Sequence, residues 1–226
     1  MMSSPVSSGT SMITDLAALR RLYSAPGERA LRKQLSQLDA HARHFIALSP
    51  LCVLASAGSG DALLDASPRG GPPGFLKTPD EHTVLLPDSG GNNRLDTLEN
   101  LLGDPRLSLL FMIPNVDEIL RINGTARLRD EMAFTDRFAH ERQRPKLVIE
   151  VHVHECYLHC AKALMRAGLW QPTQWPERSV LPTMNRMIHD QIGLAAPAES
   201  QTDMLARYRA QLAEEARRDG ADQAVR

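Results

Sequence analysis

The chain has 226 residues, with 26 lysine and arginine side chains against 27 aspartate and glutamate side chains. This near-balance leaves no net field that would draw the protein to nucleic acid or to an anionic membrane, so we expect a small-molecule partner. No segment approaches the run of about 20 apolar residues that a membrane span requires, and the Ser-rich start lacks the basic and apolar parts of a signal peptide. These features predict a cytoplasmic protein without a membrane or nucleic-acid partner.

The expected domain organisation is a disordered leader at residues 1–13, one main domain at 14–198 and a charged helix at 199–226. Helical spacing of apolar residues predicts two helices before the first strand, at 15–23 and 28–48, with Pro26-Gly27 between them. Pro50 ends the second helix, because the residue before a proline avoids the helical conformation.

From residue 51 the pattern changes to short β-type runs between turn signals. The clearest strand is 120–129, where apolar and polar side chains alternate strictly. The other expected strands are 51–57, 62–66, 74–78, 83–86, 106–113 and 146–154. The remaining helices are expected at 94–102, 131–140, 159–167, 183–191 and 199–218. Seven short strands with small helical insertions predict a mainly β protein with flanking helices, folded as a closed or split β-barrel.

The most unusual stretch is 65–75, which places three glycines and three prolines between two expected strands. Glycines such as Gly70 let a ligand approach the backbone closely, and prolines stiffen the path. Ser67 and Arg69 supply a hydroxyl and a guanidinium, which suit phosphate oxygens. The alternative is an elaborate barrel turn without a ligand.

A second stretch, 87–98, lies between an expected strand and an expected helix. Asn92 or Asn93 could cap that helix, leaving backbone N–H groups and the positive end of the helix dipole for an anion, with Arg94 beside them. This arrangement predicts a phosphate site. The alternative is an ordinary capped helix in which Arg94 pairs with a surface acid.

A third element is Arg121, on the polar side of the clearest strand beside Asn123 and Thr125. Polar groups on a barrel strand can simply face water. Together, however, the three segments offer arginine, amide and hydroxyl groups with almost no acidic catalytic pair. This combination favours binding of a phosphorylated cofactor over acid/base hydrolysis.

Several motifs in these stretches occur together in one known family. They are Ser67-Pro68-Arg69-Gly70, Pro72-Pro73-Gly74-Phe75, Leu86-Pro87-Asp88, Gly91-Asn92-Asn93-Arg94-Leu95-Asp96-Thr97 and Leu120-Arg121-Ile122-Asn123-Gly124-Thr125-Ala126. With these motifs, the chain resembles the pyridoxamine 5'-phosphate oxidase-related FMN-binding proteins, and most of all an uncharacterised bacterial subgroup. The resemblance extends over about residues 14–192.

The resemblance implies a split β-barrel that forms a homodimer, with FMN bound in clefts between the subunits. It also implies cofactor contacts from several segments of this chain. The implied cofactor-binding residues are Ser67, Arg69, Gly70, Phe75, Lys77, Asn92, Asn93, Arg94, Thr97, Arg121, Lys162 and Trp170.

The sequence departs from the family pattern at two places. Gly71 stands where we expect an aspartate in the subgroup. The substrate-binding arginine and histidine pattern of true pyridoxamine phosphate oxidases is not recognisable near the C-terminus, so vitamin B6 is not supported as the substrate.

The run at 152–160 holds His152, His154 and Cys156 on alternating positions of a strand, a spacing compatible with a transition metal or a haem iron. We expect the strand to end near Cys156 and the next helix to begin at His159. We favour buried thiols and partly exposed imidazoles, and predict no metal site. The three cysteines are odd in number, so a disulfide framework is not expected.

Two functions fit these patterns. The first is an FMN-dependent oxidoreductase, in which the flavin performs the electron transfer on a small molecule. The alternative is a non-catalytic module that binds flavin, the deazaflavin F420 or haem. The sequence alone does not identify a catalytic residue.

Overall fold

The computed structural model describes residues 12–60, 62–139, 144–193 and 199–223, with side-chain surroundings as far as Glu214. The chain divides into two compact units, Met1–Gln34 and Leu35–Arg226. The first eleven residues of the expected leader, 1–11, lie outside the described residues. The first unit carries two short helices without buried residues, α1 (Leu16–Leu22) and α2 (Glu28–Arg32).

The prediction of one helix over 28–48 was wrong, because α2 ends at Arg32 and a separate helix, α3, spans Ala40–Leu48. The intervening Leu35 is extended and pairs with Cys156, donating to its carbonyl at 2.9 Å and accepting from its N–H at 2.8 Å. Asp39 then begins α3, because its carboxylate accepts from Ala42 N at 2.7 Å. The strand contact outweighs the local helical spacing.

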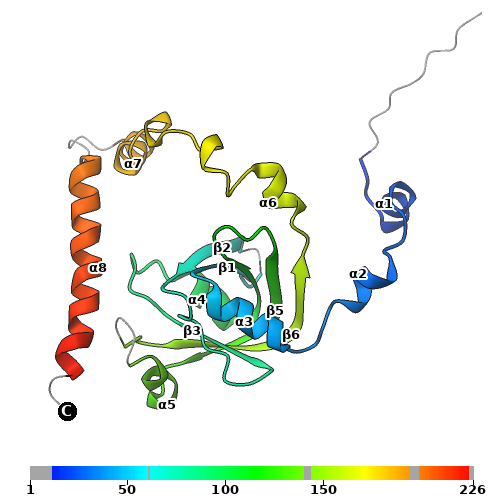
Figure 1. Cartoon of the computed structure of the whole chain (residues 1–226), viewed down its shortest axis with the longest axis horizontal. Helices are drawn as coiled ribbons and strands as arrows, with labels where there is room; N and C mark the ends of the chain where they lie inside the picture. The colour runs from blue at the N-terminus through cyan, green and yellow to red at the C-terminus, as the bar shows by residue number, and fades with distance from the viewer. Residues whose placement is uncertain (1–11, 61, 140–143, 194–198, 224–226) are drawn as a thin grey trace, which may run out of the picture. The chain divides into compact units, whose positions relative to one another are not determined.

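The second unit is built on a single antiparallel sheet, which curls into the half-barrel of a split barrel (Figure 1). Its strand order is β2-β1-β4-β5-β6-β3. The strands are β1 (Leu51–Ala57), β2 (Leu64–Gly70), β3 (Thr83–Pro87), β4 (Arg106–Met112), β5 (Ile119–Arg129) and β6 (Val148–His159). The predicted split-barrel fold is therefore confirmed.

The segment after β2 leads to β3, and these two strands stand at opposite ends of the strand order. Gly71 N donates to Pro50 O at 3.0 Å at the start of the segment. Lys77 then exchanges backbone hydrogen bonds of 3.0 and 2.8 Å with Leu85 of β3. An isolated bridge forms where a strand was expected at 74–78, so the sheet in the described residues has six strands rather than the expected seven.

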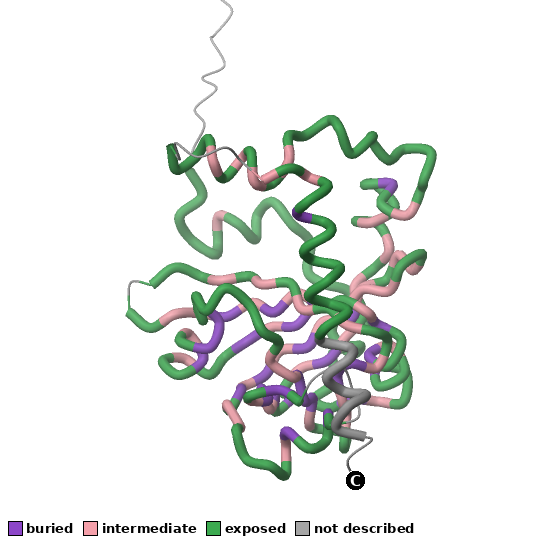
Figure 2. The backbone as a smooth tube through the Cα atoms, turned by 90° about the vertical axis from the view of Figure 1, so that its left-hand side faces the viewer, coloured by how far each residue is buried: buried purple, intermediate pink, exposed green. Residues whose placement is uncertain are grey.

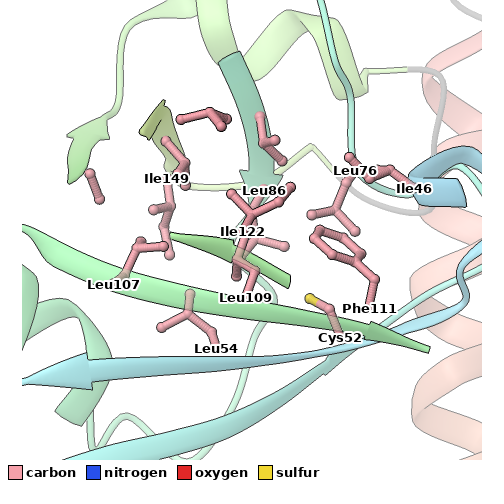
Figure 3. Packing of buried hydrophobic residues seen from close by; sticks show 14 of the residues in the cluster. Ile46, Cys52, Leu54, Leu76, Leu86, Leu107, Leu109, Phe111, Ile122 and Ile149 are labelled. Atoms are coloured by element: carbon pink, nitrogen blue, oxygen red, sulfur yellow. The ribbon is translucent and has the colours of Figure 1, made fainter. Parts of the chain in front are cut away.

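Alternate side chains of the strands point inward and form the core (Figure 3). Phe111 and Ile122 are 0% exposed, and full burial of such side chains contributes about 1.5–3 kcal/mol each. Ile46 of α3 packs into the same cluster. The helix α4 (Asp96–Gly103) follows β3 and adds Leu98 and Leu101 to the core.

A β-bulge interrupts the pairing of β5 with β6, because Asn123 pairs with Glu155 whereas Gly124 pairs with Val153. A Cβ atom on Gly124 would lie 2.2 Å from the carbonyl oxygen of His152, so only glycine fits at this crossing.

The bulge also overturns the expectation that His152, His154 and Cys156 share one face. The two histidines are exposed, whereas Cys156 is buried opposite Ile122. The strand continues to His159, past its expected end near Cys156. Because β6 pairs with β5 on both sides of the bulge, tertiary contacts hold this segment extended.

The other helices are short except the last. They are α5 (Met132–Thr135), α6 (Lys162–Ala167), α7 (Met184–Ile192) and α8 (Gln201–Gln223), with 3-10 turns at Asp136–Phe138, Pro172–Gln174 and Arg178–Val180. Buried residues gather in the strands, whereas residues 171–182 are exposed throughout (Figure 2). In the described part of the chain, no helix combines the length and apolar character needed to cross a membrane.

Candidate functional site

Strand β2 places three polar side chains on one face. Asp65, Ser67 and Arg69 alternate with the exposed Ala66 and Pro68. In the register with β1 they stand opposite Ser56, Leu54 and Cys52, whose side chains point inward. The polar face of β2 is therefore the inner face, at the edge of the half-barrel.

A hydrogen-bonded cluster connects this face to α4. Ser67 Oγ donates to Asp65 Oδ2 at 2.8 Å, and Thr97 Oγ1 donates to the same oxygen at 2.6 Å. The two hydroxyl oxygens lie 3.1 Å apart. Thr97 is only 3% exposed, so Ser67 is the more accessible hydroxyl of the two. This set is called the Asp65 cluster.

The surroundings of Asp65 favour its charged form. The Thr97 hydrogen bond is the largest cause holding the pKa of the Asp65 carboxyl below its usual value, and the Ser67 hydrogen bond and the Arg69 charge act in the same direction. Partial burial opposes them without reversing the shift. Asp65 is thus a fixed negative charge at neutral pH.

Arg69 lies in the same half-buried region but is incompletely paired. Its Nη1 atom is 3.8 Å from Asp88 Oδ1, which is too long for a hydrogen bond. Its buried Nε has no hydrogen-bond partner among the residues that the structure describes. Burial raises the pKa of Asp88 despite the opposing charges of Arg69 and Lys146, which also indicates a loose pair. Arg69 therefore retains donor capacity for another anion.

The loop after β2 is tightly packed at one point. Gly70 is exposed at the end of the strand, whereas Phe75 is 6% exposed and belongs to the core. A Cβ atom on Gly71 would lie 2.7 Å from Phe75 Cβ. The glycine that departs from the family pattern thus lets Phe75 fold back beneath the loop.

The start of α4 differs from the expected asparagine cap. Its N-cap is Leu95, in the left-handed region at φ 60°, with no side-chain cap hydrogen bond. Asn92 instead accepts from Arg94 N at 3.1 Å within the loop, and Asn93 is also left-handed at φ 61°. The left-handed conformations of Asn93 and Leu95 turn the chain into α4, and they place Leu95 rather than an asparagine at the N-cap position.

Arg94 is exposed and pairs with Asp96, its Nε lying 2.8 Å from Asp96 Oδ2. This is the surface pairing that the sequence left open as an alternative. Lys77 donates to Gly74 O at 3.2 Å and lies 5.8 Å from the Phe138 ring centroid, and burial lowers its pKa. Neither cation contacts the Asp65 cluster by a hydrogen bond that we identify among the described residues.

Arg121 lies on the opposite side of the sheet from Arg69. It pairs in register with Leu110, which in turn stands opposite Val53 on the outer face. Its Nη1 donates to Tyr157 OH at 3.0 Å, and within the described ranges its buried Nε has no hydrogen-bond partner. Within one chain, the fold therefore does not bring Arg121 together with Arg69.

The two remaining expected residues follow β6. Lys162 is exposed at the first position of α6. Trp170 is half-buried, and its indole N–H donates to Val116 O at 3.0 Å in the loop between β4 and β5. That hydrogen bond fixes the indole against the barrel.

The sequence interpretation missed Asp65, although it lies two residues before Ser67. Alternation along a strand puts residues i and i+2 on one face, and this rule would have placed the carboxylate beside the hydroxyl. The described residues contain no group of three or more His, Cys, Asp or Glu side chains arranged to hold a metal ion.

Comparison with known proteins gives one family match. A family model described as pyridoxamine 5'-phosphate oxidase matches residues 38–160, which is more than half of the chain. The matched segment includes all six strands of the sheet. No curated protein matches the chain.

Solved structures with low sequence identity are similar in part. HupZ of group A Streptococcus is 16% identical, covering 54% of this chain and 93% of that chain at a TM-score of 0.45. A putative pyridoxamine 5'-phosphate oxidase from Lactobacillus delbrueckii is 15% identical, with coverages of 55% and 98% and a TM-score of 0.44. An FAD binding protein from Mycobacterium smegmatis is 12% identical, with coverages of 55% and 97% and a TM-score of 0.39.

Proposed function

Because the chain belongs to the pyridoxamine 5'-phosphate oxidase family, we propose that it binds FMN and acts as a flavin-dependent oxidoreductase on a small molecule. The observation that carries the proposal is the buried Nε of Arg69, which has no hydrogen-bond partner in the described part of the chain. A half-buried guanidinium with an unused donor is well suited to an anionic group such as a phosphate.

The residues around Arg69 fit the polar end of FMN. Gly70 offers backbone that a ligand can approach, and Ser67 and Thr97 add hydroxyls. The start of α4 presents N–H groups without a side-chain cap, beside Asn92, Asn93 and Arg94. To bind a phosphate, Arg94 has to break its surface ion pair with Asp96 and turn its guanidinium toward the ligand.

The flavin, when bound, supplies hydride or electron transfer, so no side chain needs to be a strong acid or base. The protein's part is to bind and orient the cofactor and to exclude water. Phe75 and Lys77, on the loop that crosses from β2 to β3, support the wall of this site from the core side. The substrate is a small molecule placed against the flavin ring.

The site is proposed to be completed by a second copy of the chain. Arg69 and Arg121 occupy opposite faces of one sheet, so they reach the same flavin only if one of them comes from a partner subunit. Val53, Leu110 and Pro68 form a partly exposed apolar area on the Arg121 face, which is suited to a homodimer contact. Lys162 and Trp170 are assigned to the same shared cleft.

The test is the visible absorption of the protein after incubation with FMN and removal of unbound cofactor. We expect one flavin per chain for the wild type, and binding about tenfold weaker or more in Arg69→Ala, because a charge-assisted hydrogen bond is lost. Arg94→Ala is expected to weaken binding as well. Arg106→Ala is the matched control, because Arg106 is exposed and pairs only with Asp104 among the contacts that we identify.

A protein that retains no FMN would overturn the cofactor assignment, and F420 and haem would be tested next. Retained flavin that no reductant or oxidant converts would instead identify a non-catalytic flavin module. Equal losses of binding in Arg69→Ala and Arg106→Ala would remove Arg69 from the site.

A further inference from the structure

The hydroxyl protons of Ser67 and Thr97 are both already used in hydrogen bonds to Asp65. Both donate to the same oxygen of Asp65, at 2.8 and 2.6 Å. A hydroxyl has one proton to donate and two lone pairs that accept. While Asp65 is charged, the two hydroxyls therefore present acceptors to a ligand.

Phosphate at neutral pH offers mainly acceptors, so it does not match this arrangement. Asp65 also contributes a negative charge that repels a phosphate at close range. The neighbouring cations do not create a local excess of positive charge, because Arg69 lies near Asp88 and Arg94 pairs with Asp96. The Asp65 cluster is thus poorly suited to a phosphate dianion.

A polyol matches the same cluster well. One of its hydroxyls can donate to Ser67 Oγ, which in turn donates to Asp65, and a chain of this kind ends on a fixed negative charge. Ser67 is half-buried and accessible, whereas Thr97 is 3% exposed and mainly holds Asp65 in place. The flavin cofactor carries such a polyol as its ribityl chain.

We propose that Asp65, held in place by Thr97, makes the Ser67 hydroxyl the acceptor of a polyol-binding subsite, which recognises the ribityl chain of the flavin and leaves the phosphate to Arg69 and Arg94. The inference rests on the proposed flavin binding. It assigns Asp65 as a positioning and specificity residue, and it divides the polar residues of the site between the two parts of the ligand.

The experiment measures the Kd of three flavins by quenching of their fluorescence: lumiflavin, which lacks the ribityl chain, riboflavin, which has it, and FMN. In Asp65→Asn we expect riboflavin to bind about tenfold more weakly while lumiflavin is unchanged, since a hydrogen-bond chain to a charge is removed. The FMN affinity is expected to fall less than that of riboflavin, because removal of the charge also relieves repulsion of the phosphate. Asp104→Asn, at the far end of α4, is the matched control and is expected to alter none of the three.

A second variant covers the case in which Asp65→Asn does not fold. Ser67→Ala keeps the bond between Asp65 and Thr97 that joins β2 to α4, and it is expected to weaken riboflavin but not lumiflavin. The proposal is overturned if either folded variant binds riboflavin as the wild type does, or if FMN loses more affinity than riboflavin. Wild-type protein that binds none of the flavins overturns the proposed function together with this inference, whereas flavin binding that is indifferent to Asp65 overturns the inference alone.

Discussion

The hydroxyl of Thr97 donates to the carboxylate of Asp65 at 2.6 Å, and this bond joins the start of α4 to the edge strand β2. Thr97 is 3% exposed, so water does not readily replace the bond. The contact therefore contributes to stability as well as to the geometry of the site.

We expect Thr97→Val to lower the free energy of unfolding by about 1.5–3 kcal/mol, because a buried hydrogen bond to a charged group is lost at nearly constant side-chain volume. Urea denaturation measures the change. Thr97→Ser keeps the hydroxyl and is expected to lose less. Equal losses in the two variants would contradict the prediction, because Thr97→Ser retains the hydroxyl that bonds Asp65.

Asp65 also predicts a specific acid sensitivity. Its pKa is lowered in the folded protein, chiefly by Thr97, with Ser67 and the charge of Arg69 adding to the effect. A lowered folded-state pKa means that the stabilisation is present above the ordinary value of 3.8 and is lost as the pH falls through the folded-state pKa.

Asp65→Asn should therefore lose less stability than the wild type between pH 6 and pH 3. Urea denaturation of each protein at the two pH values measures the difference. Other carboxylates with lowered pKa values, such as Asp80, remain in both proteins and provide the shared part of the acid response. Parallel stability curves for the two proteins would contradict the assignment.

Gly71→Asp, which restores the residue expected in the subgroup, should destabilise this chain. The new Cβ would lie 2.7 Å from Phe75 Cβ, and overpacking of this kind costs about 1–3 kcal/mol. Gly91→Asp is the control, since a Cβ there meets nothing within 4 Å. The free energies of unfolding of both variants test this prediction. A Gly71→Asp protein as stable as the wild type would mean that the loop relaxes without cost.

Thiol chemistry should separate the three cysteines. Burial raises the pKa of Cys52 to about 12 and that of Cys156 to about 11, and both side chains are buried, whereas Cys160 is exposed. We expect a thiol reagent at pH 8 to modify Cys160 rapidly in the native protein and the other two only after denaturation. Loss of the rapid phase in Cys160→Ser would identify the site, and a persisting rapid phase would refute it.

The proposed homodimer predicts that Val53→Asp yields monomers. Val53 lies on the outer face between Pro68 and Leu110, so a charge there would be buried by a partner subunit. Sedimentation of wild type and variant at matched concentrations tests this, with circular dichroism as the check on folding. A dimeric Val53→Asp protein would place the interface elsewhere.

Strand positions were largely predictable because period-two alternation reflects a local property, the exposure of successive side chains. The strand at 51–57 matches β1 residue for residue, and 120–129 differs from β5 by a single position at the start. The errors lie where a distant partner decides the conformation. Leu35 was predicted to be helical but pairs with Cys156, and β6 extends to His159, beyond its predicted end, because it pairs with β5.

The candidate site was predictable in its parts but not in its assembly. Ser67, Arg69 and Thr97 were singled out by residue type and spacing, and the fold does place Ser67 next to Thr97. Arg121 was grouped with them, although the sheet register puts it on the other face. Register and sheet order depend on pairing between strands far apart in the chain, which no local pattern encodes.

The sequence by itself determined the family, the split-barrel class and the two polar segments around Ser67 and Arg94, because motifs and alternating patterns depend only on residues that are close together in the chain. Only the tertiary structure decided that Asp65 accepts hydrogen bonds from both hydroxyls, that the Nε of Arg69 has no partner among the described residues, and that Arg69 and Arg121 lie on opposite faces of the sheet. Which of these groups lie close enough to form hydrogen bonds depends on how the curled sheet and α4 bring the side chains together, and these distances exist only in the folded chain.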